Sequence, residues 1–324
     1  MKIVLVGVYY PVAILRYFEA ALRRREDVEL YTVGPYTGRQ IPWSSGMFVD
    51  EPPAPCKAPD MTLPMSMVPK MTEVESMLPW EPDVWITVDA AYHLQGKPRH
   101  GTSLHIGTDP HCVNYDYNRS VARVFFNMQT PYMKDGDVWL PYAYDPVWHA
   151  PTTEPPVKQY DFGIVGADGR QGSLYDNRDN LVKMLRAKGY TVLQLFGTVY
   201  EAYRDALTQC KVGLNWSTQK DTTARVFETM GMGVALLTNR TPDLSKIGFL
   251  DGATYAGFDS LDEAEGRAMW LMGNDNWVEM SELGHAAVQK HTWDIRIDEV
   301  LKYARALDNP SNSSSGRSKD CRNS

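Results

Sequence analysis

The stretch TTARVFETMGMGVALLT, from Thr222 to Thr238, carries the clearest fold signal in the chain. Apolar residues recur at helical spacing in its middle and predict a helix of about two turns. Gly231 and Gly233 predict the end of this helix, because glycine tolerates the left-handed turn found there. The continuous apolar run that follows is typical of a parallel strand covered on both faces. The stretch therefore indicates an α/β protein.

The start of this helix is a candidate anion site, because free backbone N–H groups and the helix dipole point toward a ligand there. Thr222 or Thr223 is the expected N-cap, with a hydroxyl that accepts a hydrogen bond from a backbone N–H. Arg225 and Glu228 lie three positions apart and are neighbours on the helix surface. One side chain can meet a phosphate and the other a pair of hydroxyls. The alternative is a surface salt bridge between the two.

The block Arg-Val-Phe-Glu, followed by Gly-x-Gly and an apolar strand, resembles the donor-binding segment of group 1 glycosyltransferases, most closely the spore-maturation CgeB-like branch. In these enzymes the glutamate binds the ribose of a nucleotide sugar, which implies that role for Glu228. The family often has an acidic residue eight positions earlier, where this chain has Lys220. Either the adjacent Asp221 substitutes for it, or the donor sugar differs.

The resemblance extends over roughly residues 100–305 and is strongest at 160–240. Asp161 to Gly166 is similar to the D-x-G-F-V-G element of the CgeB-like branch, and the glycine-rich loop after it suits a diphosphate. Arg170 and Arg178 are its candidate cationic partners; the alternative is that Arg178 is a solvated helix residue. A final His-Thr-Trp-x-x-Arg, at 291–296, is similar to the terminal block of the family.

Length, charge and cysteine content limit the classes of function that the chain can have. A chain of 324 residues favours two domains. Its net charge of −7 lacks the electrostatic footprint of nucleic-acid binding. We expect no membrane span, since no apolar run approaches ~20 residues, and no signal peptide at the N-terminus. The four cysteines lack metal spacing, so we expect free thiols and a cytoplasmic location.

In the first half of the sequence, the pattern predicts a strand at 2–8, a helix at 12–25 and a strand at 28–33. This order is typical of the start of a doubly wound sheet. Four more strands are expected at 84–88, 103–107, 121–127 and 138–140. The segment 35–82 is rich in Pro and Met, and we interpret it as a surface loop with a short helix near 68–78; a lid or an acceptor surface is the alternative.

Asp109 and His111 are the candidate catalytic residues, because a carboxylate and an imidazole that follow a strand end suit general acid–base chemistry. The alternatives are an Asx turn at Asp109 and an ordinary loop histidine at His111. His105, within an apolar strand, is interpreted as a core histidine.

The second half starts after a proline-rich linker at 145–156. Strands are expected at 160–166, 191–196, 211–216 and 234–237, and helices at 177–188, 199–209, 261–272 and 277–289. A last helix is expected to cross back to the first half. A polar, serine-rich tail at 309–324 is expected to be disordered.

These features predict two Rossmann-like domains that face a cleft, the GT-B arrangement. We expect an acceptor-side domain at 1–150, a nucleotide-sugar-binding domain at 151–290 and a returning helix at 291–308. The resemblance implies a metal-independent glycosyltransferase (EC 2.4 class) without a cofactor. The candidate donor-binding residues are Gly166, Arg170, Arg178, Gly197, Asp221, Thr222, Thr223, Arg225 and Glu228.

The sequence does not identify the acceptor, which can be a glycan, a protein, a small molecule or modified DNA. A DNA-base glycosyltransferase of the phage type is thus a special case, in which arginines of the first helix, at 16 and 23–25, would form a basic groove. A nucleotide-sugar epimerase or phosphorylase of the same fold agrees with the same features, and so does a non-catalytic protein that binds a nucleotide sugar. The donor sugar, its base, the stereochemistry and the oligomeric state stay open.

Overall fold

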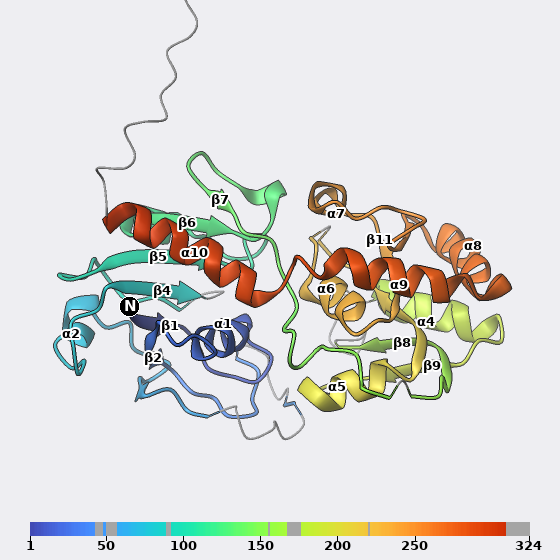
Figure 1. The fold of residues 1–324 in the computed structure, drawn as a ribbon, viewed down its shortest axis with the longest axis horizontal. Coiled ribbons are helices and arrows are strands. Elements are labelled where there is room, and N and C mark those ends of the chain that lie inside the picture. Colours follow the sequence, from blue (N-terminus) through green and yellow to red (C-terminus); the bar gives the residue numbers. More distant parts are fainter. Residues whose placement is uncertain are drawn as a thin grey trace, which may run out of the picture.

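The computed structural model describes residues 1–42, 48–49, 57–88, 92–154, 156–166, 176–219 and 221–308. Within them the chain forms two parallel sheets that lie side by side along the long axis of the molecule (Figure 1). Helices flank both sheets, as expected when parallel strands are joined by crossover connections. The predicted class, two Rossmann-like α/β units in the GT-B arrangement, is confirmed.

The first sheet has seven described strands in the order β3-β2-β1-β4-β5-β6-β7, all parallel. They are β1 Lys2–Val6, β2 Glu29–Gly34, β3 Met61–Thr62, β4 Val84–Val88, β5 Thr102–Gly107, β6 Val124–Asn127 and β7 Val138–Trp139. Its helices are α1 Ile14–Arg23, α2 Met71–Glu75, α3 Asp116–Val121 and the 3-10 turn η1 Thr130–Tyr132. The central strands β1 and β4 are almost fully buried, which explains their continuous apolar sequences.

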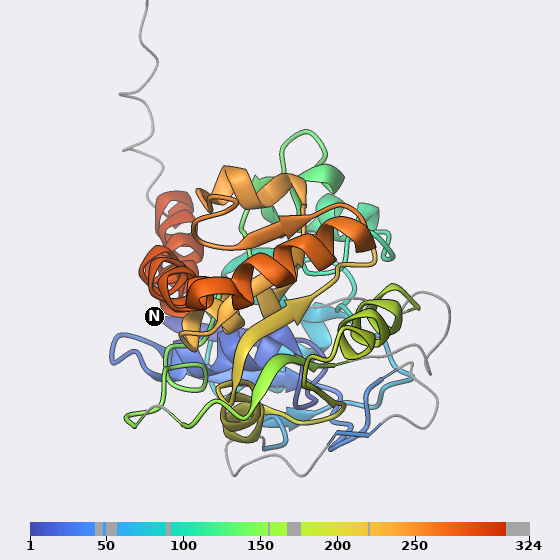
Figure 2. The same cartoon turned by 90° about the vertical axis from the view of Figure 1, so that its right-hand side faces the viewer.

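The second sheet has five described strands in the order β12-β11-β10-β8-β9, again all parallel. They are β8 Tyr160–Val165, β9 Val192–Leu195, β10 Cys210–Asn215, β11 Ala235–Asn239 and β12 Ala256–Phe258. The helices are α4 Asp176–Ala187, α5 Tyr200–Leu207, α6 Ala224–Gly231, α7 Pro242–Ile247, α8 Leu261–Met272 and α9 Asn276–Val288, with η4 Gly273–Asp275 before α9. Helix α9 packs against β11 and α6 (Figure 2).

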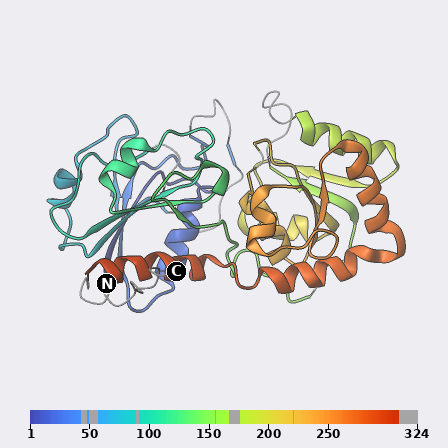
Figure 3. The ribbon, with the colours of Figure 1, turned by 90° about the horizontal axis from the view of Figure 1, so that it is seen from above.

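The last helix, α10 Trp293–Asp308, leaves the second half and packs along α1 and β5 of the first (Figure 3). This confirms the predicted return. The predicted domain boundaries stay predictions, and the tail at 309–324 lies outside the described residues. None of the helices in the described residues has the length and apolar character needed to cross a membrane.

Several short elements differ from the prediction. Helix α3 ends where a strand was expected to begin, and β6 starts only at Val124. Helix α7 and strand β12 were not predicted. Elements of three to six residues are too short to show a hydrophobic period.

The proline- and methionine-rich segment agrees with a surface loop only in part. Helix α2 lies inside the predicted 68–78 range, and Met65, Met67 and Met77 are exposed. Ile41 and Val49, in contrast, line a cavity between the two sheets. The rest of this segment, at 43–47 and 50–56, lies outside the described residues.

Candidate functional site

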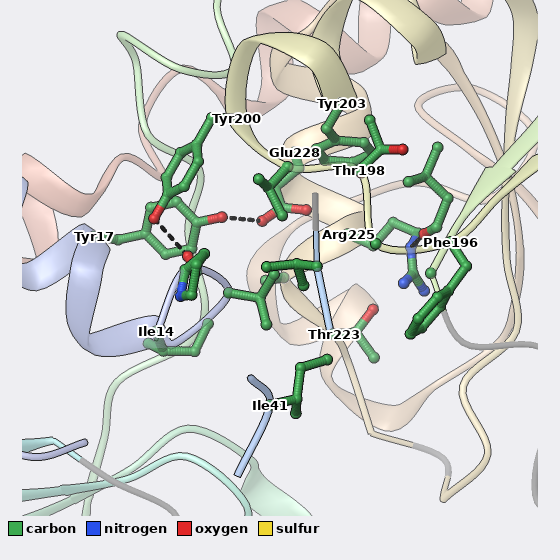
Figure 4. Close-up of a pocket in the computed structure, with 18 of the residues that line it drawn as sticks. Ile14, Tyr17, Ile41, Phe196, Thr198, Tyr200, Tyr203, Thr223, Arg225 and Glu228 are labelled. Atoms are coloured by element: carbon green, nitrogen blue, oxygen red, sulfur yellow. Dashed lines mark hydrogen bonds between the residues drawn. The ribbon is translucent and has the colours of Figure 1, made fainter. Parts of the chain in front are cut away.

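A cavity of about 400 Å³ lies between the two halves, where strands of both sheets end. The second half supplies Gly166 after β8, residues 196–199 after β9, and the start of α6. The first half supplies residues that follow β1, together with Tyr17 of α1. We call this space the first cavity (Figure 4). Its position fits the rule that ligands of open α/β sheets bind outside the carboxyl ends of the strands.

Arg225 is fixed at the wall of the first cavity by two acceptors from neighbouring strands. Its Nε donates to the Val165 carbonyl at 3.0 Å, and one Nη donates to Oδ1 of Asn215 at 3.2 Å. Gly166 has a φ of +136°, and a Cβ at this position would overlap the Arg225 guanidinium. The glycine is thus required both by the backbone and by the arginine.

Glu228 is buried on α6 and faces the opposite half of the molecule. The Tyr17 hydroxyl donates to Oε1 of Glu228 at 3.2 Å (Figure 4), and Nε2 of His149 lies 4.0 Å from the same oxygen. Arg225 and Glu228, both within the described residues, form no ion pair with each other. The surface salt bridge between them, which the spacing also allowed, is therefore wrong.

His149 is a fully buried neighbour of Glu228 whose tautomer follows from its surroundings. The Asp145 N–H donates to Nδ1 of His149 at 3.3 Å, so Nε2 carries the proton in the neutral ring. Burial lowers the pKa of His149, against the opposing effect of Glu228. Sequence reasoning missed both His149 and Tyr17, because they come from the linker and from α1, far from Glu228 in the chain.

The threonines before α6 do not act as predicted. Thr223 occupies the N-cap position, but its hydroxyl makes no cap bond and donates to Oδ1 of Asn215 at 3.2 Å. The Thr222 hydroxyl pairs with that of Thr241 in a buried contact. The cap prediction was therefore correct in position and wrong in its hydrogen bond, because the Thr223 hydroxyl is directed to Asn215 of β10.

Two other donor-side candidates, Gly197 and Arg178, lie in the wall of the first cavity. Gly197 has a φ of +81° in the cavity wall. Arg178 also lines the first cavity; it is buried, with its Nε donating to the Trp216 carbonyl at 2.9 Å, so it is not a solvated helix residue. Arg170, like Lys220, lies outside the described residues.

A second cavity, of about 250 Å³, adjoins the first and shares with it residues at the start of α6, among them Thr223. Asp109 and Asp221 both line it. Oδ2 of Asp109 accepts from the Thr108 hydroxyl at 2.8 Å. Burial raises the pKa of Asp109, against the opposing effects of the Thr108 hydrogen bond and of His111, and the Asp221 charge adds a smaller increase.

The predicted catalytic pair is divided between two cavities. His111 lines a separate one, on the side of α3, and its ring lies 6.1 Å from that of Tyr132. His105 is 4% exposed in β5, and burial lowers its pKa to about 3, which confirms the interpretation as a core histidine.

The arginines of α1 and the turn after it form no basic groove. Arg16 and Arg23 both contact Glu19. Arg24 binds Asp145 and Asp294, and Arg25 binds Asp27 and Asp298. Each guanidinium is therefore already paired with a carboxylate.

The described residues hold no group of three or more His, Cys, Asp or Glu side chains arranged for a metal ion. Metal independence itself stays a prediction.

Comparison with known proteins finds a family match in the second half of the chain. Residues 159–302 match the family model described as glycosyl transferase-like. A search of curated proteins found no match. The match supports the predicted likeness of the second half to glycosyltransferases. The CgeB-like branch stays a prediction.

Several solved structures share the whole fold. An α-glucosyltransferase in complex with UDP and a 13-mer DNA with a central A:G mismatch has a TM-score of 0.60 at 9% identity, over 94% of this chain and 100% of that one. Sucrose-phosphate synthase from Thermosynechococcus elongatus has a TM-score of 0.58 at 10% identity, over 95% and 99%. AviGT4, a glycosyltransferase involved in avilamycin A biosynthesis, has a TM-score of 0.54 at 16% identity, over 95% and 98%. At such identities these neighbours establish the GT-B fold alone.

The contact between Gly166 and Arg225 can be tested by a double-mutant cycle. Gly166→Ala should destabilise the protein by about 1–3 kcal/mol through overlap with the guanidinium, in addition to backbone strain. In an Arg225→Ala background the overlap is absent, so the same substitution should cost less. Urea denaturation of the four proteins measures the coupling.

Gly189→Ala is the matched control, since Gly189 has a φ of +88° and open space around its Cβ position. Its cost should not depend on Arg225. If Gly166→Ala lowers the free energy of unfolding equally with and without Arg225, the guanidinium does not require the empty Cβ position of residue 166.

Proposed function

We propose that the protein is a glycosyltransferase that moves a sugar from a nucleotide-sugar donor to an acceptor hydroxyl without a metal ion. One observation carries this proposal. The first cavity brings a fixed guanidinium, a buried carboxylate and the start of α6 to one side of the interdomain space, and a carboxylate-lined cavity adjoins it. The family match at 159–302 includes the elements that supply the donor side.

The donor diphosphate is assigned to the start of α6 and the end of β8. Backbone N–H groups and the helix dipole favour an anion at this point. Arg225 and Arg178 both line the cavity beside it. As the sugar leaves, negative charge grows on the diphosphate, and groups that are already fixed stabilise it without reorganising.

The nucleoside is assigned to the space between the β9 loop and the first half. Phe196 and Gly197 lie on one side of this space, and the apolar Ile41 and Val49 lie on the other (Figure 4 shows Phe196 and Ile41). The Tyr17 hydroxyl donates to Oε1 of Glu228, and we assign the ribose hydroxyls to the same carboxylate. UDP is the first nucleotide to test, because the α-glucosyltransferase of the same fold was solved with it.

The acceptor is assigned to the second cavity, with Asp109 as the general base. The acceptor oxygen forms the new bond to the anomeric carbon of the sugar. The bond from this carbon to the diphosphate oxygen breaks, and the nucleoside diphosphate leaves with the bonding electron pair. The acceptor proton passes to the Asp109 carboxylate, which makes the hydroxyl a better nucleophile. His111 lines a different cavity, and we assign it no proton transfer.

Product analysis separates a transferase from an epimerase and from a non-catalytic protein. The protein is incubated with a panel of nucleotide sugars, with and without acceptors, and the products are identified by mass spectrometry and NMR. A transferase gives a glycosylated acceptor and free nucleotide. An isomerised nucleotide sugar in the absence of acceptor would indicate an epimerase instead, and binding without turnover would indicate a non-catalytic protein.

Glu228→Ala should weaken nucleotide-sugar binding by about 1–3 kcal/mol, the range of a lost hydrogen bond to a charged group. Tyr17→Phe is the control, because it removes only the bond between Tyr17 and Glu228 and leaves the carboxylate. It should change donor affinity less. Isothermal titration calorimetry on folded samples measures both; unchanged affinity in Glu228→Ala excludes the ribose role.

Asp109→Asn should reduce turnover by about 10²–10⁴-fold and leave donor affinity nearly unchanged. The pKa of Asp109 is raised, chiefly by burial. A base with a raised pKa is protonated at a higher pH than an ordinary aspartate, so wild-type turnover should fall on the acid side through this raised pKa. The fall should be absent from the residual activity of Asp109→Asn. A pH profile that is the same in both proteins would remove Asp109 from the mechanism.

Turnover should be unchanged after the protein is treated with excess EDTA and desalted, because the proposed partners of the diphosphate are Arg178, Arg225 and the start of α6. Addition of Mg²⁺ or Mn²⁺ should give no large increase. Loss of activity with EDTA and its recovery with either ion would contradict the metal-free mechanism.

A further inference from the structure

The second cavity contains two carboxylates and, among its described lining residues, no Lys, Arg or His. In each carboxylate one oxygen is engaged by a nearby hydroxyl: Oδ2 of Asp109 by Thr108, and Oδ1 of Asp221 by Ser217. The other two oxygens, Oδ1 of Asp109 and Oδ2 of Asp221, accept no hydrogen bond from the described residues. The cavity thus offers two carboxylate oxygens, one from each aspartate, that can accept hydrogen bonds from a ligand.

Two negative charges in a confined space are unfavourable unless a positive charge joins them. Asp221 is only 8% exposed, so solvent screens it poorly. At Asp109 burial is the main cause of a raised pKa; the Asp221 charge contributes in the same direction, and Thr108 and His111 oppose it. A neutral acceptor would leave this repulsion in place and favour protonation of the proposed base. A cationic acceptor would relieve it and keep Asp109 ionised.

The size of the cavity limits what can enter. Its volume of about 250 Å³ is below the ~300–1,000 Å³ of pockets for drug-sized ligands. Tyr10 and Tyr142 add aromatic surface to the wall. Thr223 and Ala224 line both cavities, so the second cavity borders the space assigned to the donor. One small ring, free or at the end of a larger molecule, matches this space.

We propose that the acceptor is a small polyhydroxylated amine, such as an amino sugar or an aminocyclitol, whose ammonium group binds between Asp109 and Asp221. This rests on the proposed function and names the substrate class of its acceptor site. The ammonium donates to the two free carboxylate oxygens, and a neighbouring hydroxyl of the same molecule is the nucleophile. The proton of this hydroxyl passes to Asp109 as the bond between the hydroxyl oxygen and the donor sugar forms.

The test uses matched compounds and the full-length protein. Glucosamine, glucose and glucuronate, together with 2-deoxystreptamine and inositol, are compared by thermal shift and calorimetry in the presence of UDP. The amines should bind about tenfold or more tightly than their neutral counterparts, the lower range for a hydrogen bond to a charged group. Glucuronate should bind worst. Asp221→Asn should abolish most of this preference, whereas Asp262→Asn, at an exposed carboxylate on α8, should keep it.

Several results would overturn the proposal. These are equal or tighter binding of the neutral or anionic compounds, no binding of either amine, or an amine preference that persists in Asp221→Asn. Glycosylation of duplex DNA with hydroxymethylated bases would also overturn it, because such a base enters the site without an ammonium group. Donor affinity is measured on the same samples with a nucleotide-sugar panel. If no nucleotide sugar binds, the proposed function is contradicted. If a nucleotide sugar binds but the amines are not preferred, only the acceptor class is contradicted.

Discussion

The pairing of the two chain segments that connect the halves is the constraint on which both cavities depend. The Tyr144 N–H donates to the His291 carbonyl, and the Trp293 N–H donates to the Tyr144 carbonyl, each at 3.1 Å. Arg24, from the turn after α1, binds Asp145 on one segment and Asp294 on the other, at 2.9 Å each. Because Asp145 is fully buried, loss of its partner would leave an uncompensated charge in the interior. The two connections and the first half are therefore held as one unit.

These paired connections, around Tyr144–Asp145 and His291–Asp294, are called the hinge here, and they also bring together the groups around Glu228. Asp145 turns the chain by accepting from the N–H groups of Val147 and Trp148, and its own N–H fixes the His149 ring. The carboxylate of Glu228 thus receives a hydroxyl from α1 and faces an N–H from the linker. Glu228, on α6 of the second half, is therefore contacted by the first half and by the linker, so its surroundings depend on how the two sheets are placed.

Two further contacts join the halves around the cavities. The Tyr200 hydroxyl donates to the Pro11 carbonyl beside the first cavity. The Thr130 N–H donates to the buried Asp243 carboxylate at 3.0 Å. Each links a loop of the first sheet to a helix of the second. Together with the hinge they keep the first and second cavities adjacent, which is the arrangement that a transfer between two bound molecules requires.

The sequence by itself determined the parallel α/β class, most long elements and the importance of the block around Arg225 and Glu228, because hydrophobic period and glycine position are local properties. It could not reveal short elements such as α7, whose pattern is too brief. Only the tertiary structure decided that Tyr17 and His149 meet Glu228, that Asp109 and Asp221 share a cavity, and that His111 lies elsewhere. These side chains are far apart in the chain, and their contacts depend on how two sheets are oriented by the hinge, which no local pattern encodes.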